Sequence, residues 1–215
     1  MTVMMCRQSG VGVAEPLAFQ IAFHGPFHVG GLGAVGGMDR VLDRDFLLPG
    51  SSLKGLLRAE ARERLGIPKP WLEATFGREG DHPSPWWWSD GVVDSPTFGR
   101  AVRIKINPDT SASERGFLAL GEEVWARTGH FTVAPMINLP EERLPTAEQR
   151  LLIRACARSV STLGGGRNRG SGWVTLTDGE PWTITESTAF LAMRESAVQR
   201  QDLALGDPFE KVRND

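Results

Sequence analysis

Two stretches of helical periodicity, each framed by strand-like segments, limit the architectures open to this 215-residue chain. In residues 52–65 and 147–163, apolar side chains recur at the three- and four-residue spacing of an amphipathic helix. Residues 16–24 and 173–177 instead have the apolar and alternating patterns of short strands. A chain of this length buries its own core, so we expect one domain spanning residues 1–215.

The segment between the helical stretches predicts a hairpin. Residues 100–106 alternate basic and apolar side chains, as expected of a strand with one face in water. Arg100, Arg103 and Lys105 mark that face. Turn-forming residues come next, and we place the return strand around residues 124–133. The hairpin is therefore expected to be long, with an irregular tip that projects from the body.

The order strand, helix, strand, hairpin, helix, loop and strand predicts an α+β fold. The best match is a ferredoxin-like (RRM-like) core, with helices on one face of an antiparallel sheet. One more strand is expected near residues 87–93, beside three consecutive tryptophans at 86–88. These tryptophans could stack bases, but core packing is favoured because neighbouring strand residues point to opposite faces. The tail from Glu186 onward has room for another helix, whose bounds the sequence pattern does not define.

Composition favours a cytoplasmic protein without a membrane anchor. The two cysteines, Cys6 and Cys156, are far apart, which suggests neither a disulfide framework nor a zinc site. No run of eighteen apolar residues occurs, and the first residues do not resemble a signal peptide.

The distribution of charge favours a nucleic-acid partner more than the total does. A net charge of -2 argues mildly against binding phosphates, yet residues 150–177 contain five arginines and no acid. Basic residues also stand four apart on both helical stretches, which predicts one positive face formed by Lys54, Arg58, Arg62, Arg150, Arg154 and Arg158. At the start of the first helix, Ser51 or Ser52 is expected to cap the backbone, and Lys54 to help it attract a phosphate.

A glycine-rich loop follows the second helix. Five of the nine residues 164–172 are glycine, and two others are arginine. Such a loop can be a plain helix C-cap, but its bare backbone can also approach a phosphate closely. We favour the second interpretation, with RNA contacts from Gly165, Gly166, Arg167, Asn168, Arg169 and Gly170.

Several blocks together resemble the RAMP superfamily, the repeat-associated proteins of CRISPR systems. The most specific are FHVGG at 27–31, AVGGMD at 34–39 and LPGSSLKG at 48–55 followed by Arg58. Later blocks, including WWWSDGVVD and GGGRNRGSGWV, resemble the backbone subunit of type III CRISPR effector complexes. About three quarters of the chain is covered by these similarities.

The resemblance implies partners and a geometry. Backbone subunits stack as a filament of copies along the CRISPR RNA, beside other effector subunits, and pair the guide with target RNA. A hairpin thumb, here about residues 106–131, displaces one nucleotide per subunit. Lys54, Arg58 and the glycine-rich loop would contact guide phosphates.

The resemblance also implies a catalytic aspartate. A loop aspartate of the family supports metal-dependent cutting of target RNA, and by position this residue is Asp39, with Mg²⁺ as the expected cation. Asp43 and Asp45 are weaker substitutes, and Asp39 could instead bond a turn or pair with Arg40.

Three hypotheses follow for the function of the chain. The first is an endoribonuclease subunit of a type III complex that uses Asp39. The second is a structural subunit that binds the guide and does not cut. The third, less favoured, is a metal-independent enzyme that processes guide precursors with His28.

Overall fold

The structure, a computed structural model, describes residues 14–30, 40–78, 80, 82–166 and 170–205. The side chains of residues 105, 114–117 and 197–205 also lie outside the description. In chain order the elements are β1 (Leu17–Phe23), α1 (Gly50–Glu63), α2 (Lys69–Phe76), β2 (Trp86–Trp88), β3 (Val92–Val93), β4 (Thr97–Ile106), β5 (Ser113–Trp125), β6 (Thr128–Pro135), a 3-10 turn (Glu141–Arg143), α3 (Ala147–Ser159), β7 (Val174–Thr177) and α4 (Ile184–Leu205).

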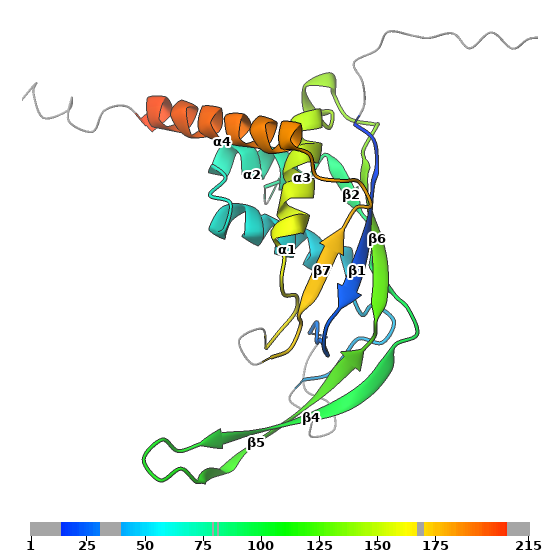
Figure 1. The fold of residues 1–215 in the computed structure, drawn as a ribbon, viewed down its shortest axis with the longest axis vertical. Helices are drawn as coiled ribbons and strands as arrows, with labels where there is room; N and C mark the ends of the chain where they lie inside the picture. Colours follow the sequence, from blue (N-terminus) through cyan, green and yellow to red (C-terminus); the bar gives the residue numbers. More distant parts are fainter. Residues whose placement is uncertain (1–13, 31–39, 79, 81, 167–169, 206–215) are drawn as a thin grey trace, which may run out of the picture.

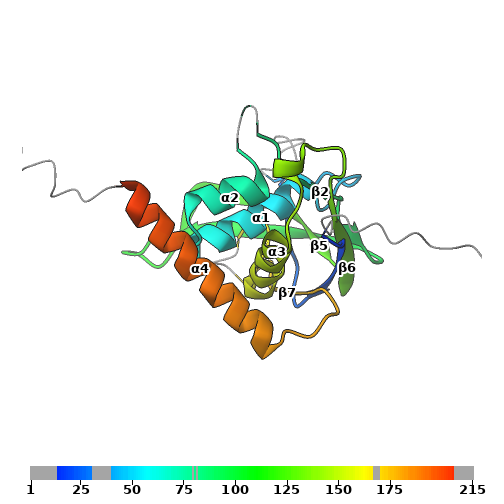
Figure 2. The same cartoon turned by 90° about the horizontal axis from the view of Figure 1, so that it is seen from above.

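The central sheet has the ferredoxin-like order predicted from the sequence. Its strands lie in the order β2-β6-β1-β7, every neighbouring pair is antiparallel, and β3 extends the β2 edge along β6. Helices α1 and α3 follow the first and third of the four core strands and pack together on one side of the sheet (Figures 1 and 2). The predicted α+β architecture is therefore confirmed.

The core lies between this sheet and the two helices. In β1 the inward residues Leu17, Phe19, Ile21 and Phe23 are buried, and the alternate residues face outward. The apolar stripes of the helices meet them, as predicted, through Leu53, Leu57, Ala61, Leu152, Ile153 and Cys156. Burial raises the pKa of the Cys156 thiol, which makes it an inert core residue.

The tryptophan run divides its side chains between core and solvent. Trp86 is buried and donates from Nε1 to Gln149 Oε1 at 3.1 Å, whereas Trp87 is exposed. Gln149 is also the third helical residue of α3 and completes the predicted capping box with Thr146. One glutamine thus joins the start of α3 to the edge strand β2.

The start of α1 differs from the prediction of a serine cap. The N-cap residue is Pro49, and the amide of Gly50 donates to Asp90 Oδ1 at 2.7 Å. A side chain on Gly50 would lie 2.6 Å from the Trp88 carbonyl, so only glycine permits this approach. Asp90 therefore caps the helix from another part of the chain, while Ser51 and Ser52 lie exposed within it.

The hairpin formed by β4 and β5 projects from the body (Figure 1). Its return strand is Ser113–Trp125, so the predicted placement at residues 124–133 was wrong. Residues 128–135 form β6, a central strand of the other sheet. The chain leaves the hairpin between Trp125 and Thr128, and the sequence pattern does not reveal this break because strand-like apolar residues stand on both sides of it. The hairpin is thus an insertion between β3 and β6.

Residue alternation along β4 also corrects the predicted basic face. The register is continuous from Thr97 to Ile104, so Arg100 and Arg103 point to opposite faces. Arg100 lies opposite Glu122, and further toward the tip the same face is apolar and exposed, with Val102, Ile104, Ile106 and Leu118.

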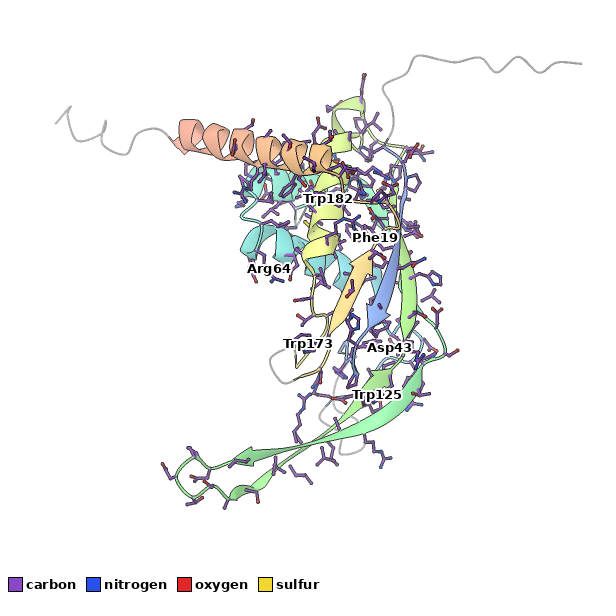
Figure 3. All side chains as sticks on the ribbon, in the orientation of Figure 1. Phe19, Asp43, Arg64, Trp125, Trp173 and Trp182 are labelled. Carbon is purple, nitrogen blue, oxygen red and sulfur yellow. The ribbon has the colours of Figure 1, made fainter. Side chains whose placement is uncertain are left out.

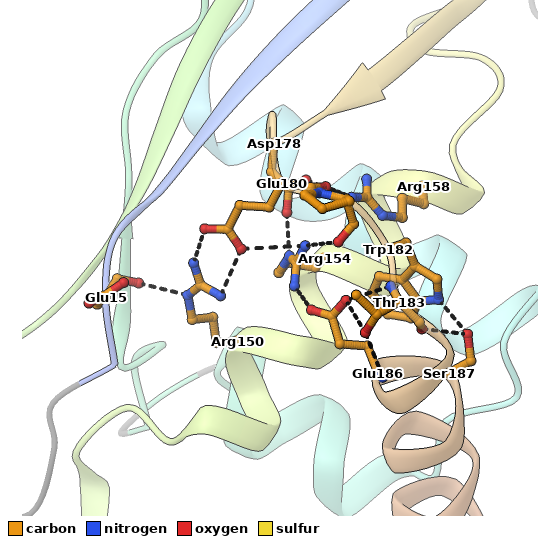
Figure 4. A network of polar contacts seen from close by, with 11 residues as sticks. Glu15, Arg150, Arg154, Arg158, Asp178, Glu180, Trp182, Thr183, Glu186 and Ser187 are labelled. Carbon is orange, nitrogen blue, oxygen red and sulfur yellow. Dashed lines mark hydrogen bonds and ion pairs between the residues drawn. The ribbon is translucent and has the colours of Figure 1, made fainter.

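Helix α4 is held against α3 by a network of charges (Figure 4). The Arg154 side chain, 3% exposed, contacts the carboxylates of Asp178, Glu180 and Glu186. Arg158 bonds Asp178 as well, and both guanidinium groups lie near the ring of Trp182. Three acids that follow α3 in the sequence thus neutralise its basic stripe. Within the described ranges, no helix has the length and apolarity to cross a membrane.

Candidate RNA-binding groove

A groove separates α1 from the glycine-rich loop. Its volume is about 310 Å³, within the range of small-ligand sites. Helix α1 contributes Ser52, Gly55, Leu56 and Ala59, and the loop contributes Gly164 and Gly165; Val29, Gly30, Leu48, Leu53 and Leu163 complete the lining. Two of the predicted contact residues, Ser52 and Gly165, are therefore brought together although more than 100 positions separate them.

Backbone geometry explains why glycine occupies the loop. Gly164 and Gly172 have φ of 75° and 81°, and a side chain on either would collide with a carbonyl, at 2.3 Å from His28 and 2.0 Å from Leu163. The Gly165 amide donates to the His28 carbonyl at 2.8 Å. That amide is consequently not available to a phosphate. The predicted hydrogen bonds from loop N–H groups to phosphates would have to come from other residues of the loop.

The cations of α1 lie away from the groove. At 100° per residue, Lys54 lies on the far side of the helix from Ser52. Arg58 donates from Nη1 to the Gly77 carbonyl at 2.6 Å, so it secures the end of α2. Phosphate contacts by Lys54 and Arg58 stay predictions, and the described groove lining does not include either residue.

The two arginines predicted on α3 require a correction. Arg154 is buried and Arg158 bonds Asp178 at 2.8 Å, so neither presents a free charge to RNA. The predicted convergence of two arginine-lined helices is therefore wrong, because α3 turns this stripe toward the acids of residues 178–186.

Two other cations lie beside the glycine-rich loop. A Cβ built on Gly165 would be 2.8 Å from Arg40 Nη2, and one on Gly166 would be 2.9 Å from Arg103 Nη2. Arg103 also forms an ion pair with Glu123 of β5 at 3.6 Å. Glu123 in turn accepts a hydrogen bond from the hydroxyl of Ser171 in the loop at 3.4 Å, so the hairpin contacts the loop directly. RNA contact by Arg103 stays a prediction, and for Arg40 the sequence suggested only a pairing with Asp39.

The expected catalytic residue lies outside the described residues, as do Arg167, Asn168, Arg169 and the side chain of Lys105. Gly30 and Arg40 flank the segment that contains Asp39, and both lie beside the groove or its loop. Among the described residues, no three His, Cys, Asp or Glu side chains gather as a metal site. Asp43 accepts the amides of Asp45 and Phe46, which is a turn-stabilising role.

His28 lies beneath the groove and joins three segments. Its Nδ1 is 2.9 Å from the Glu122 carbonyl of the hairpin, which assigns the proton to Nδ1, and its own carbonyl accepts from Gly165. Only 4% of the residue is exposed. Burial lowers the pKa of His28, the hydrogen bond to Glu122 opposes this, and Arg40 and Arg103 lower it further. This environment suits a structural histidine and does not favour the precursor-processing hypothesis.

We expect acid to weaken the fold through His28. Since its folded-state pKa lies below the ordinary 6.5, the unfolded chain takes up the proton first, and stability falls as pH drops through and below 6.5. Urea unfolding at pH 7.5 and 5.5 measures this loss. His28→Asn keeps a donor for Glu122 and cannot titrate, so its urea midpoint should change less between the two pH values. An equal change in both proteins would contradict the assignment.

Several groove residues were missed in the sequence. Gly55, which is exposed, and Ala59, which is partly buried, are two small residues one turn apart on α1, and this spacing is a sequence signal that another segment can approach the helix closely. Gly30, Leu56 and Leu163 had no comparable signal, because their grouping depends on how the loop folds back onto α1.

Comparisons with known proteins agree with this fold. A chain in the cryo-EM structure of the type III-B Cmr-beta bound to cognate target RNA superposes with a TM-score of 0.60 and 14% identity, covering 76% of this chain and 97% of that chain. A chain of Cmr-beta in the apo state gives 0.59 and 13%, covering 77% and 98%. No curated protein matches. The family model of the RAMP superfamily matches residues 20–175, and the chain therefore belongs to the RAMP superfamily.

Proposed function

We propose that this protein is a guide-binding backbone subunit of a type III CRISPR effector complex. The observation that carries the proposal is the groove in which α1 and the glycine-rich loop face each other. Both elements contain the motifs that resemble the guide-binding segments of the family, and Arg40 and Arg103 lie on the loop side. The two solved structures compared above are of the type III-B Cmr-beta, one of them bound to cognate target RNA.

The projecting hairpin supports a role in ordering the guide and target strands. Its distal part projects from the body, and Val102, Ile104 and Leu118 expose more than half of their surface along one face. Apolar side chains gathered on a projection indicate a surface that is covered in an assembly. We propose that this hairpin is the thumb that displaces a nucleotide, next to further copies of the subunit.

We further propose that Asp39 supports cleavage of the target RNA. Asp39 directly precedes Arg40, which lies between the hairpin root at Gly121 and the loop at Gly165. A carboxylate with Mg²⁺ there would help to remove a 2′-hydroxyl proton and to neutralise phosphate charge. The second candidate is a purely structural subunit that binds the guide and does not cut.

Placing a negative charge in the groove tests the binding proposal. A Cβ on Gly55 would meet nothing within 4 Å, so Gly55→Glu adds a carboxylate to the groove without a steric conflict at Cβ. We expect single-stranded RNA to bind about tenfold more weakly, since repulsion of about 1.4 kcal/mol has this effect. Filter binding or fluorescence anisotropy at several salt concentrations measures the change.

Gly55→Ala is the matched control, because it fills the same position without charge and favours the helix by about 0.5–1 kcal/mol. It should bind RNA nearly as well as the wild type. If Gly55→Glu and Gly55→Ala bind equally, the groove is not the RNA site, and if the wild type binds no RNA the proposed function is wrong.

A further inference from the structure

The face of the sheet opposite the helices, here called the open face, is polar and carries tryptophans at both edges. A depression of about 380 Å³ in it is lined by Gln20, Asp94, Thr128, His130, Thr175 and Thr177, with Ile21, Ala22 and Gly129. Trp87 of β2 is 55% exposed, and Trp173, the residue before β7, is 54% exposed. Alternation along β7 places Trp173 on the open face with Thr175 and Thr177.

Trp173 is joined to the candidate groove by the glycine-rich loop. The loop lines the groove with Gly164 and Gly165, and its last glycine, Gly172, donates to the Pro26 carbonyl at 2.7 Å. The residue after it is Trp173, whose carbonyl accepts from the His24 amide at 2.8 Å. The tryptophan is therefore fixed by backbone bonds at the exit of the loop, where Figure 3 places it near the lower end of β7.

Hydrogen-bonding groups lie beside the exposed ring. His24 Nε2 and Thr175 Oγ1 are 2.8 Å apart, and Thr175 belongs to the same face as Trp173. An exposed indole held by its backbone is a stacking surface that loses little entropy on binding, and neighbouring imidazole and hydroxyl groups can bond a base edge. Among the residues that the structure describes, the lining of the neighbouring depression includes no Lys or Arg, so a phosphate is a poorer fit there than a base or ribose.

We propose that Trp173 stacks on one unpaired nucleobase of the RNA that leaves the groove, with His24 and Thr175 beside the base. This proposal rests on the proposed function, since it requires RNA in the groove. It is favoured over a protein partner because the ring continues the loop that lines the groove.

The test compares two tryptophans of equal exposure at opposite edges of one sheet. Trp173→Ala in the full chain should bind single-stranded RNA about tenfold more weakly, in the range measured for one stacked base. The salt dependence should keep its slope, because stacking releases no counterions. Trp173→Phe should restore most of the affinity, and Trp87→Ala should match the wild type.

Equal affinities of Trp173→Ala and Trp87→Ala for RNA would overturn the proposed stacking by Trp173, as would a Trp173→Phe variant that binds no better than Trp173→Ala. Ultraviolet crosslinking of wild-type protein to RNA gives a readout that needs no variant. The peptide containing Trp173 should carry the nucleotide, and crosslinks found only elsewhere would contradict the proposal while leaving RNA binding intact. A wild-type protein that binds no RNA would overturn both proposals.

Discussion

Replacing Arg154 with methionine is expected to lower the free energy of unfolding by about 3–5 kcal/mol, the cost of removing one partner from a buried ion network. Methionine fills a similar volume but leaves Asp178, whose side chain is 1% exposed, and Glu186 without their main partner. Burial alone would raise the pKa of Asp178, yet the hydrogen bond and charge of Arg154, together with Arg158, hold it below its ordinary value. Without Arg154, the effect of burial on the pKa of Asp178 is no longer fully offset, and the charged carboxylate is destabilised in the folded state. Chemical denaturation at pH 7 measures the loss.

Arg62→Met is the matched control for this loss of charge. Arg62 pairs with Glu63 on α1, and both side chains are more than 60% exposed, so the change should stay within about 0.5 kcal/mol. Limited proteolysis gives a second readout, since α4 should be cut sooner in Arg154→Met because its tie to α3 is lost. A loss below about 1 kcal/mol would show that the network contributes little.

Asp39→Ala is expected to slow cleavage of target RNA about a hundredfold or more in a complex assembled with guide RNA, while target binding is retained. General acid or base groups contribute about 10²–10⁴ in rate, which sets the size of the effect. Chelation with EDTA should stop the same reaction and leave binding in place. A time course of end-labelled target measures cleavage, and anisotropy measures binding.

Asp43→Ala separates the two aspartates of this region. Its carboxylate stabilises a turn through the amides of Asp45 and Phe46, so cleavage should change far less than in Asp39→Ala. Loss of cleavage in Asp43→Ala alone would transfer the catalytic role to Asp43. A wild-type complex that binds target and never cuts would instead select the structural subunit.

The sequence predicted those parts of the fold that depend on local patterns. Strand β1, the apolar faces of α1 and α3 and the Thr146–Gln149 capping box follow from spacing along one element, and the structure confirms them. The order of elements was then enough to predict the ferredoxin-like sheet. Helix boundaries shifted by a few residues, since α3 ends at Ser159 and the chain continues extended.

Features set by distant partners were not predictable in this way. The basic stripe of α3 looked like an RNA-binding surface because its spacing cannot reveal that Asp178 and Glu186 fold back onto Arg154. Similarly, Asp90 caps α1 from a loop 40 residues further along the chain, which left the neighbouring serines without that role. The spacing of charged residues along one helix does not show whether they face solvent or a buried partner, because that partner is brought to them by tertiary contacts.

The two ends of the hairpin insertion are joined by hydrogen bonds, so the distal hairpin can be replaced without changing the sheet. Asp94 and Thr128, on either side of the insertion, bond each other through the Asp94 amide at 3.0 Å and the Thr128 hydroxyl at 2.7 Å. The sheet register at Val93 and Gly129 is thereby set before the insertion begins. Lineages could therefore lengthen, shorten or resurface the distal hairpin, and engineers could graft another, while the root contacts near Val124 and the rest of the domain stay unchanged.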